Sequence, residues 1–216
     1  MDVENNFMNI AVLVSGGGTN LQALIDYEKS HSECPYHIVI VIADTKKAFA
    51  LERAKKAGVA TEIVSPFAVL GAEKAKEADK EEKREAVSNA ALAAAKKAGA
   101  DAIVLAGWLT VLSGNIITEY SGRIVNLHPA LLPKFGGVGM WGHFVHEAVL
   151  AAHETESGCT VHLVDAGCDT GKILVQKKVP VMPDDTPDTL YARIAPHEHE
   201  AMVEGVCLLA KQIVAG

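Results

Sequence analysis

Short runs of apolar residues alternate along the chain with stretches in which apolar positions recur at helical spacing. Residues 9–14 (NIAVLV) and 36–45 (YHIVIVIADT) are apolar runs of the length expected for strands buried on both faces. Between them, the apolar positions of 21–25 follow a helical stripe, and Thr19 is the expected N-cap of that helix. Strand, helix and strand in this order predict parallel strands joined by helices.

The pattern continues to the C-terminus. Further strands are expected at 60–65, 101–108, 123–128, 159–165 and 172–181. Further helices are expected at 48–58, 72–98, 113–120, 143–153 and 186–214, with Pro196 as a candidate break in the last. Because the last two strands follow one another without a helix, they predict an antiparallel edge.

The predicted fold class is therefore a Rossmann-like α/β domain, with a mostly parallel sheet, helices on both faces and an antiparallel edge. No domain boundary or repeat is visible, so residues 1–216 are expected to form a single domain. Residues 1–8 are polar and acidic, and we expect them to be a flexible N-terminal extension.

Composition excludes several classes of function. The formal net charge is −7 and no long basic run occurs, which argues against nucleic acid as a partner. No run of 18 apolar residues occurs, so no membrane span is expected. The N-terminus lacks a secretory pattern, and the four cysteines form no C-x-x-C pair. These features predict a cytoplasmic protein with reduced thiols.

The glycine-rich turn SGGGTN (15–20) lies between the first strand and its helix. A dinucleotide site is one interpretation, since Asp44 ends the second strand, but Leu21 replaces the third glycine of that motif. A tight turn without a ligand is another. We favour a single phosphate, because a helix start offers free N–H groups to an anion. The residues expected to hold it are Gly18, Thr19 and Asn20.

The strand at 123–128 ends with two polar side chains. Asn126 and His128 are two positions apart, so an extended backbone points both to the same side. Pro129 then ends the strand, which leaves both side chains at the edge where α/β sheets bind ligands. Asp165 and Asp169 lie in the turn between the last two strands, and a carboxylate there could reach the imidazole.

Four segments together resemble one known family: VSGGGTNLQALID, LAGWLTVLS, RIVNLHPALLPKF and GCTVHLVDAGCDTGKILVQ. The chain, from about residue 9 to its end, resembles the phosphoribosylglycinamide formyltransferases, which are folate-dependent enzymes of purine synthesis. The resemblance implies that the amine of 5'-phosphoribosylglycinamide takes a formyl group from 10-formyltetrahydrofolate. It implies these two small molecules as partners, no metal, and a monomer or homodimer.

The resemblance also implies residue roles. Asn126, His128 and Asp169 match the catalytic positions, and Glu198 matches a glutamate near the glycinamide amine. Gly18, Thr19 and Asn20 match the turn that binds the ribonucleotide phosphate. The positions that match the folate site are Arg84, Leu109, Thr110, Val111, Leu112, Asp165, Ala166, Gly167 and Cys168. A cis bond is implied between Leu132 and Pro133.

The implied chemistry explains the choice of side chains. Attack of the amine on the formyl carbon gives a tetrahedral species with an oxyanion, to which Asn126 and His128 can donate hydrogen bonds. Asp169 would orient the imidazole and favour its charged form. Neither Cys159 nor Cys168 has an evident base nearby in the sequence, and we interpret both as packing residues.

Some positions depart from the family pattern. Thr110 stands where arginine occurs in some members, so folate contacts there are expected from the backbone. Lys172 replaces a common proline. The segment 134–143 is longer than usual, and either a lid or a well-packed loop would fit it.

Several histidines have open interpretations. His143 and His146 match no metal motif, so a partly exposed helix face is preferred to a metal site. His162 faces either the core or the site. Three rival functions also stay open: a formyltetrahydrofolate hydrolase, a formyltransferase acting on methionyl-tRNA, and a non-catalytic nucleotide-binding module. The first two would be expected to carry a further domain.

Overall fold

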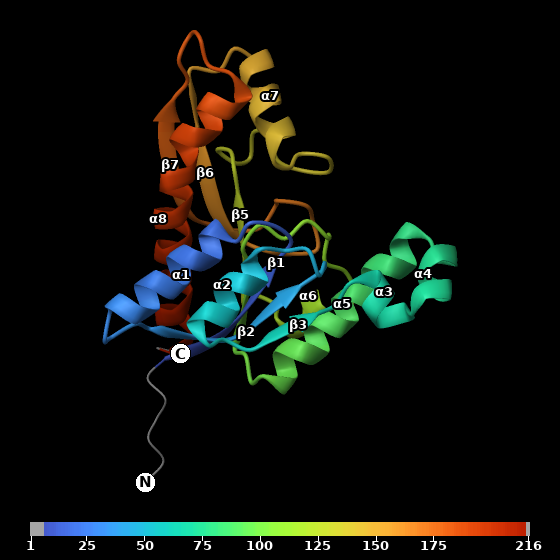
Figure 1. The fold of residues 1–216 in the computed structure, drawn as a ribbon. Helices are drawn as coiled ribbons and strands as arrows, with labels where there is room; N and C mark the ends of the chain where they lie inside the picture. Colours follow the sequence, from blue (N-terminus) through green and yellow to red (C-terminus); the bar gives the residue numbers. More distant parts are fainter. Residues whose placement is uncertain (1–6, 215–216) are drawn as a thin grey trace.

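Seven strands form one sheet in the computed structural model, which describes residues 7–214 (Figure 1). Their order across the sheet is β3-β2-β1-β4-β5-β6-β7. The strands are β1 (Met8–Val14), β2 (Tyr36–Ala43), β3 (Thr61–Ile63), β4 (Ala102–Leu105), β5 (Ile124–His128), β6 (Glu156–Leu163) and β7 (Ile173–Pro180).

The pairing confirms the predicted mixture of strand directions. Strands β1 to β5 are paired in parallel, whereas β6 pairs antiparallel with both β5 and β7. In the β5–β6 pair, Asn126 stands opposite His162 and His128 opposite Thr160. This register brings the end of the parallel part against the start of the antiparallel edge.

Eight helices accompany the described part of the sheet. They are α1 (Thr19–Ser30), α2 (Ala50–Ala57), α3 (Pro66–Leu70), α4 (Ala72–Glu77), α5 (Lys80–Lys97), α6 (Asn115–Glu119), α7 (His143–Ala151) and α8 (Pro187–Val214). The apolar residues of β1 alternate between two cores. Ile10 and Val12 pack with α1, α2 and α8, whereas Ala11 and Leu13 pack with α5 and α6. Helices on both faces explain why β1 is apolar throughout.

The segment 72–98 is not the single helix that its composition predicts. Helix α4 ends before Ala78, and Asp79 then caps α5 by accepting a hydrogen bond from the Glu82 N–H at 2.9 Å. A further short helix, α3, precedes them, and Figure 1 shows α3 and α4 projecting beside the start of α5. The cap stops one helix and starts the next because an N-cap residue has extended backbone angles.

Two other helices differ from expectation. Gly18, with a φ of 70°, precedes α1 at the N-cap position, so Thr19 is the first residue of the helix and not its cap. Helix α8 continues through Pro196 without a break. Gly205 of α8 faces β6 so closely that an added Cβ would lie 2.5 Å from a Val161 methyl group. The long helix therefore rests directly on the antiparallel edge.

The first six residues of the expected N-terminal extension lie outside the described residues. Met8 is buried and begins β1, so the first strand starts one residue earlier than its apolar run predicts. Among residues 7–214, no helix combines the length and the apolar character that a membrane crossing requires.

Candidate active site

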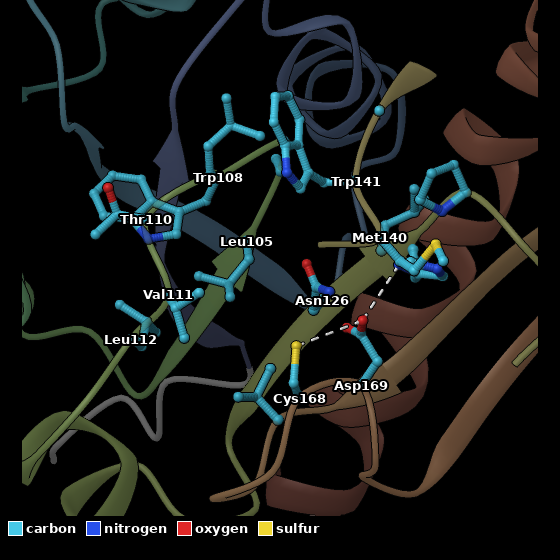
Figure 2. Close-up of a pocket in the computed structure, with 18 of the residues that line it drawn as sticks. Leu105, Trp108, Thr110, Val111, Leu112, Asn126, Met140, Trp141, Cys168 and Asp169 are labelled. Atoms are coloured by element: carbon cyan, nitrogen blue, oxygen red, sulfur yellow. Dashed lines mark hydrogen bonds and ion pairs between the residues drawn. The ribbon is translucent and has the colours of Figure 1, made fainter. Parts of the chain in front are cut away.

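A cavity of about 1220 Å³ opens beyond the carboxyl ends of β1, β4 and β5. This is the edge at which α/β sheets generally bind ligands. The site residues that the sequence predicts all line the cavity, from the glycine turn through Arg84, the 109–112 segment and the 165–169 loop to Glu198. Figure 2 shows part of this lining, with the 109–112 segment across from Asp169. Folding thus collects segments that are far apart in the sequence.

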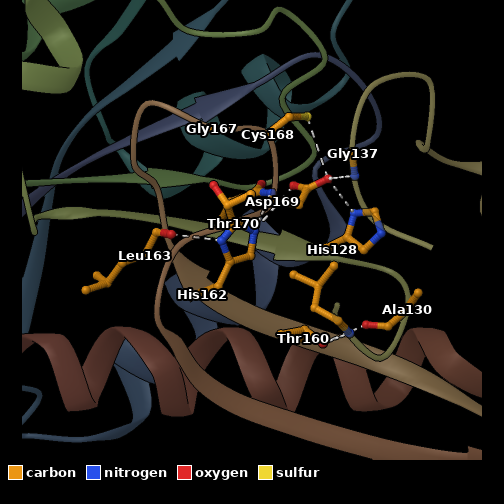
Figure 3. Close-up of polar contacts among 12 residues, drawn as sticks. His128, Ala130, Gly137, Thr160, His162, Leu163, Gly167, Cys168, Asp169 and Thr170 are labelled. Atoms are coloured by element: carbon orange, nitrogen blue, oxygen red, sulfur yellow. Dashed lines mark hydrogen bonds and ion pairs between the residues drawn. The ribbon is translucent and has the colours of Figure 1, made fainter. Parts of the chain in front are cut away.

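Asn126 and His128 both reach the cavity from β5, as the alternation of strand side chains predicts. Asp169 lies in the turn between β6 and β7, where its backbone is left-handed with a φ of 58°. Its Oδ2 is 3.6 Å from His128 Nδ1. Figure 3 shows the carboxylate between the rings of His128 and His162. We call Asn126, His128, His162 and Asp169 the polar centre.

His162 belongs to this centre and not to the apolar core, although it is buried. Its Nδ1 is 2.8 Å from the Leu163 carbonyl oxygen, which can only accept, so Nδ1 carries the hydrogen. Nε2 of the neutral ring is then an acceptor, and the Asn126 amide lies 3.2 Å from it. The same Nε2 is 3.5 Å from Asp169 Oδ1. One amide hydrogen of Asn126 is directed to His162, which leaves the other for a ligand.

The hydrogen bonds of His128 fix its tautomer. Nε2 lies 2.7 Å from the carbonyl oxygen of Phe135, so it carries a hydrogen and donates it there. In the neutral ring, Nδ1 therefore presents a lone pair toward Asp169. Burial lowers the pKa of His128, against the attraction of the Asp169 carboxylate, which raises it. A second donor from this ring requires a proton on Nδ1.

Asp169 is held in its charged form by its neighbours. Burial alone would raise its pKa, but His162, the Gly137 N–H and His128 together lower it. The Gly137 N–H donates to Oδ2 at 3.0 Å. The Cys168 thiol also lies 3.8 Å from Oδ2. The charge of this carboxylate favours positive charge on the His128 ring.

The two cysteines near this loop differ. Cys168 is half-buried, lines the cavity and lies beside the Asp169 carboxylate, so it is not confined to the apolar core. Its pKa is raised by burial and by the Asp169 charge, which makes it a poor nucleophile. Cys159 is fully buried in the core, and burial raises its pKa to about 12. It packs as expected.

The glycine turn occupies another end of the cavity. Gly18 needs its glycine, because its φ is 70° and an added Cβ would lie 2.5 Å from the Ala50 Cβ. Thr19 and Asn20 form the first turn of α1, whose N–H groups have no intrahelical partners. Glu198 of α8 is buried nearby, and burial raises its pKa to about 7, although the Asn20 side chain works against this shift.

The 109–112 segment is tied to the ends of β1 and β2. The Leu109 N–H donates to Ser15 Oγ at 2.9 Å, and the Ser15 hydroxyl donates to Asp44 Oδ2 at 2.8 Å. The Thr110 hydroxyl donates to the same carboxylate oxygen at 2.8 Å. Asp44 is therefore occupied by two hydroxyl groups, and its use as a ribose ligand in a dinucleotide site is not favoured. Sequence reasoning gave no role to Ser15.

The 165–169 loop is braced by its own first residue. Asp165 Oδ1 accepts hydrogen bonds from the Gly167 N–H at 2.9 Å and from the Thr170 hydroxyl at 2.6 Å. These bonds, with that of Thr170 contributing most, lower the pKa of Asp165 against the effect of burial. The Asp165 carboxylate thus holds the loop in shape, and residues 165–169 line the cavity.

Arg84 lies in the first half of α5 and lines the cavity. Its Nε is buried and has no hydrogen-bond partner within residues 7–214, while Nη1 lies 3.4 Å from Glu81. Since 37% of the side chain is exposed, the guanidinium can present its other N–H groups to an anionic ligand in the cavity.

Trp141, in the loop before α7, lines the cavity and pairs with Phe144, the second residue of α7. The rings of Trp141 and Phe144 meet edge to face, with centroids 5.1 Å apart, and Trp141 is 52% exposed. The expected exposed helix face is correct for His143 but wrong for His146, which is buried and whose pKa burial lowers to about 4. No group of three or more metal-ligating side chains occurs in the described part of the chain. The bond between Leu132 and Pro133 is cis, as the resemblance implies.

Known formyltransferases match this chain over almost its whole length. The family model described as Formyl transferase matches residues 8–206. The chain is 36% identical over 194 residues to the phosphoribosylglycinamide formyltransferase of Escherichia coli, an alignment that covers 89% of this chain and 82% of that one. It is 40% identical over 203 residues to the trifunctional purine biosynthetic protein adenosine-3 of Drosophila melanogaster, and spans 93% of this chain but 14% of that protein.

Solved structures of transformylases are also similar to this chain over almost its whole length. The glycinamide ribonucleotide transformylase 1 of Symbiobacterium toebii is similar, with a TM-score of 0.83, 34% identity, and coverage of 97% of this chain and 90% of that one. The phosphoribosylglycinamide formyltransferase of Brucella melitensis has a TM-score of 0.78 and 38% identity, with coverage of 97% of both chains.

Proposed function

The chain belongs to the phosphoribosylglycinamide formyltransferase family, and we propose that it carries out the reaction for which this family is named. The formyl group of 10-formyltetrahydrofolate is transferred to the amine of 5'-phosphoribosylglycinamide. The products are formylglycinamide ribonucleotide and tetrahydrofolate, in the de novo synthesis of purines. The trifunctional relatives are much longer than this chain, so the proposal covers formyl transfer alone.

One observation carries the proposal. Asn126, His128 and Asp169 come from two separate segments, yet they converge on a single cavity, with His128 Nδ1 3.6 Å from the Asp169 carboxylate. An amide donor, an imidazole and a carboxylate are the groups that a transfer through an oxyanion requires.

The reaction needs no covalent intermediate with the protein. The amine nitrogen forms a bond to the formyl carbon, the carbonyl oxygen becomes an oxyanion, and the bond from carbon to the folate nitrogen then breaks. One proton leaves the attacking amine and one reaches the departing nitrogen. The protein's task is to hold the two reactants together and to stabilise the negative oxygen.

Asn126 is well placed to stabilise that oxygen. His162 takes one hydrogen of the Asn126 amide and so fixes the orientation of the group, and the other hydrogen remains for the oxyanion. We propose that His162 is in this way a positioning residue. A donor whose direction is set before the reaction costs no reorganisation during it.

His128 would assist in its charged form. Because Nε2–H is directed to the Phe135 carbonyl and Nδ1 faces Asp169, the imidazolium would stabilise the oxyanion chiefly through its positive charge. Asp169, charged and adjacent, favours that form. The two residues therefore act as a unit, and the loss of either removes much of the same stabilisation.

The remaining lining fits the two reactants. Gly18, Thr19 and Asn20 would bind the ribonucleotide phosphate through N–H groups at the start of α1, with Glu198 near the glycinamide amine. The folate would lie against the wall formed by Leu109, Thr110, Val111 and Leu112 and the loop formed by Asp165, Ala166, Gly167 and Cys168. Arg84 would offer its guanidinium to a folate carboxylate. Since the Thr110 hydroxyl is bound to Asp44, Thr110 would contact the folate through its backbone.

A spectrophotometric assay tests the proposal. The protein is mixed with 5'-phosphoribosylglycinamide and a 10-formyl folate donor, and deformylation of the donor is followed by absorbance. We expect turnover that depends on the ribonucleotide. Turnover that does not depend on it would identify a hydrolase, and binding of both molecules without turnover would identify a non-catalytic module. A cytoplasmic location and a monomeric or homodimeric state stay predictions.

A further inference from the structure

The carbonyl groups of the glycine turn accept hydrogen bonds from α2. The Ala50 N–H donates to the carbonyl oxygen of Gly16 at 3.1 Å. The Arg53 side chain donates from Nε to the carbonyl oxygen of Gly17 at 2.8 Å. Both carbonyl groups therefore point toward α2, although Arg53 is 36 positions away along the chain. Neither Ala50 nor Arg53 lines the cavity, whereas all three glycines do.

The direction of a carbonyl group fixes the direction of the N–H beside it. In a trans peptide the C=O of one residue and the N–H of the next point in opposite directions. With the carbonyls of Gly16 and Gly17 turned toward α2, the N–H groups of Gly17 and Gly18 point away from it. Neither N–H has an acceptor among residues 7–214. Together with the first N–H groups of α1, they form a row of donors at the cavity.

These peptide groups need support to hold this orientation. Glycine adopts positive and negative φ angles with similar ease, so the peptide between Gly17 and Gly18 can rotate at little cost. After such a rotation a carbonyl oxygen would point into the cavity where an N–H now does. The hydrogen bond from Arg53 opposes that rotation.

The Arg53 guanidinium is itself fixed on more than one side. Its Nη1 donates to Gln22 Oε1 at 3.1 Å, and Gln22 in turn donates to Asp26 at 2.8 Å. The Phe49 ring lies below the guanidinium, with its centroid 5.2 Å from the Cζ atom. A planar group with three such contacts has little freedom to leave the Gly17 carbonyl.

We propose that Arg53 is a positioning residue for the phosphate of the ribonucleotide, acting through the Gly17 carbonyl to keep the N–H groups of the turn directed at the anion. This inference rests on the proposed function for the identity of the substrate. It does not depend on that function for the binding of phosphate at the turn. The positive charge of Arg53, which lies on the α2 side of the turn, also favours an anion at the turn.

Arg53→Met tests the role, because methionine retains much of the side-chain volume but donates no hydrogen bond. We expect the KM for the ribonucleotide to rise about tenfold, as for the loss of a hydrogen bond to a charged group, while kcat and the KM for the folate donor stay within about twofold. Arg53→Lys should recover part of the loss, since an ammonium can donate to the same carbonyl. Lys56→Met is the matched control: it removes a positive charge from an exposed position of the same helix.

Binding of inorganic phosphate or ribose 5-phosphate, measured by calorimetry, provides a readout that needs no turnover. We expect Arg53→Met to weaken it by a similar factor, and Lys56→Met to leave it unchanged. If the wild type has no formyltransferase activity but Arg53→Met still weakens phosphate binding, the proposed function fails and this inference stands. Unchanged phosphate binding, an equal rise in both KM values, or a lower melting temperature with normal kinetics would each overturn it.

Discussion

At the glycine turn the donors are backbone N–H groups held by α2, and no residue from 16 to 20 has an ionisable side chain. At the polar centre the donors are side chains, and two imidazoles share one carboxylate. The turn therefore depends on backbone conformation and is insensitive to protonation of its own residues. The polar centre depends on charge, and removing one member changes the state of the others. One cavity thus combines a binding end defined by peptide geometry with a reacting end defined by proton positions.

The largest expected effect comes from a substitution at the polar centre that should leave binding at the glycine turn unchanged. Asp169→Asn removes the charge that favours the His128 imidazolium, so we expect kcat to fall by about a thousandfold. The KM for the ribonucleotide should change little, because the phosphate is held at the turn. Steady-state kinetics checks this, with calorimetric phosphate binding as the control. A comparable loss of phosphate binding would contradict the separation.

The second prediction concerns Glu198, which brings a titratable group to the turn. Its pKa is raised by burial to about 7, against an ordinary value of 4.5. A carboxyl group whose pKa is raised by folding favours the folded state while it is protonated. This stability is fully present below the pKa of the unfolded chain and is lost as the pH rises through the pKa of the folded protein. Between pH 4.5 and 8 the wild type should therefore lose on the order of 3 kcal/mol relative to Glu198→Gln, whose amide does not ionise.

Denaturant unfolding at both pH values measures this difference. Glu200→Gln, an exposed position on the same helix, is the control and should show no such trend. The pKa of His146 is lowered by burial to about 4, so this residue destabilises the fold as pH falls below 6.5. Its effect is of opposite sign and cancels when the variant is compared with the wild type. Parallel curves for Glu198→Gln and the wild type would show that the carboxyl is not buried as described.

The smallest effect concerns Asp44, which connects the glycine turn to the wall of the cavity formed by residues 109–112. Asp44→Ala removes the acceptor that Ser15 and Thr110 share, so we expect the KM for the folate donor to rise roughly fivefold. Asp44→Asn retains an acceptor oxygen and should behave more like the wild type. Separate KM measurements for the two substrates sharpen the comparison: an equal rise for the ribonucleotide would mean that Ser15 transmits the change to the turn.

The parallel part of the fold could be predicted because burial on both faces leaves a plain signal. The apolar runs of β1 and β2 have no other common explanation in a chain of this composition. The position of Asn126 and His128 on one face also followed from alternation alone. The break between α4 and α5 was predictable but missed, since Asp79 stands three residues before Glu82, as in an N-terminal cap.

The role of His162 could not be predicted in the same way. Strand β6 is buried along nearly its whole length, so alternation does not reveal which side faces the cavity. What decides it is the antiparallel register that places His162 opposite Asn126, and this register depends on the shape of the turn and on packing. The contact of Arg53 with Gly17 has no signal in the sequence either, because one side chain meets a distant carbonyl group.

The hydrogen bond from Gly137 to Asp169 makes the glycine-rich segment before α7 a partner in the acidity of the carboxylate. This N–H helps to lower the pKa of Asp169. If the segment swings outward to admit or release a molecule, the bond breaks and the carboxylate holds a proton more readily. His162 and His128 alone would then keep that pKa below its ordinary value, so the position of this segment would affect the acidity of the polar centre.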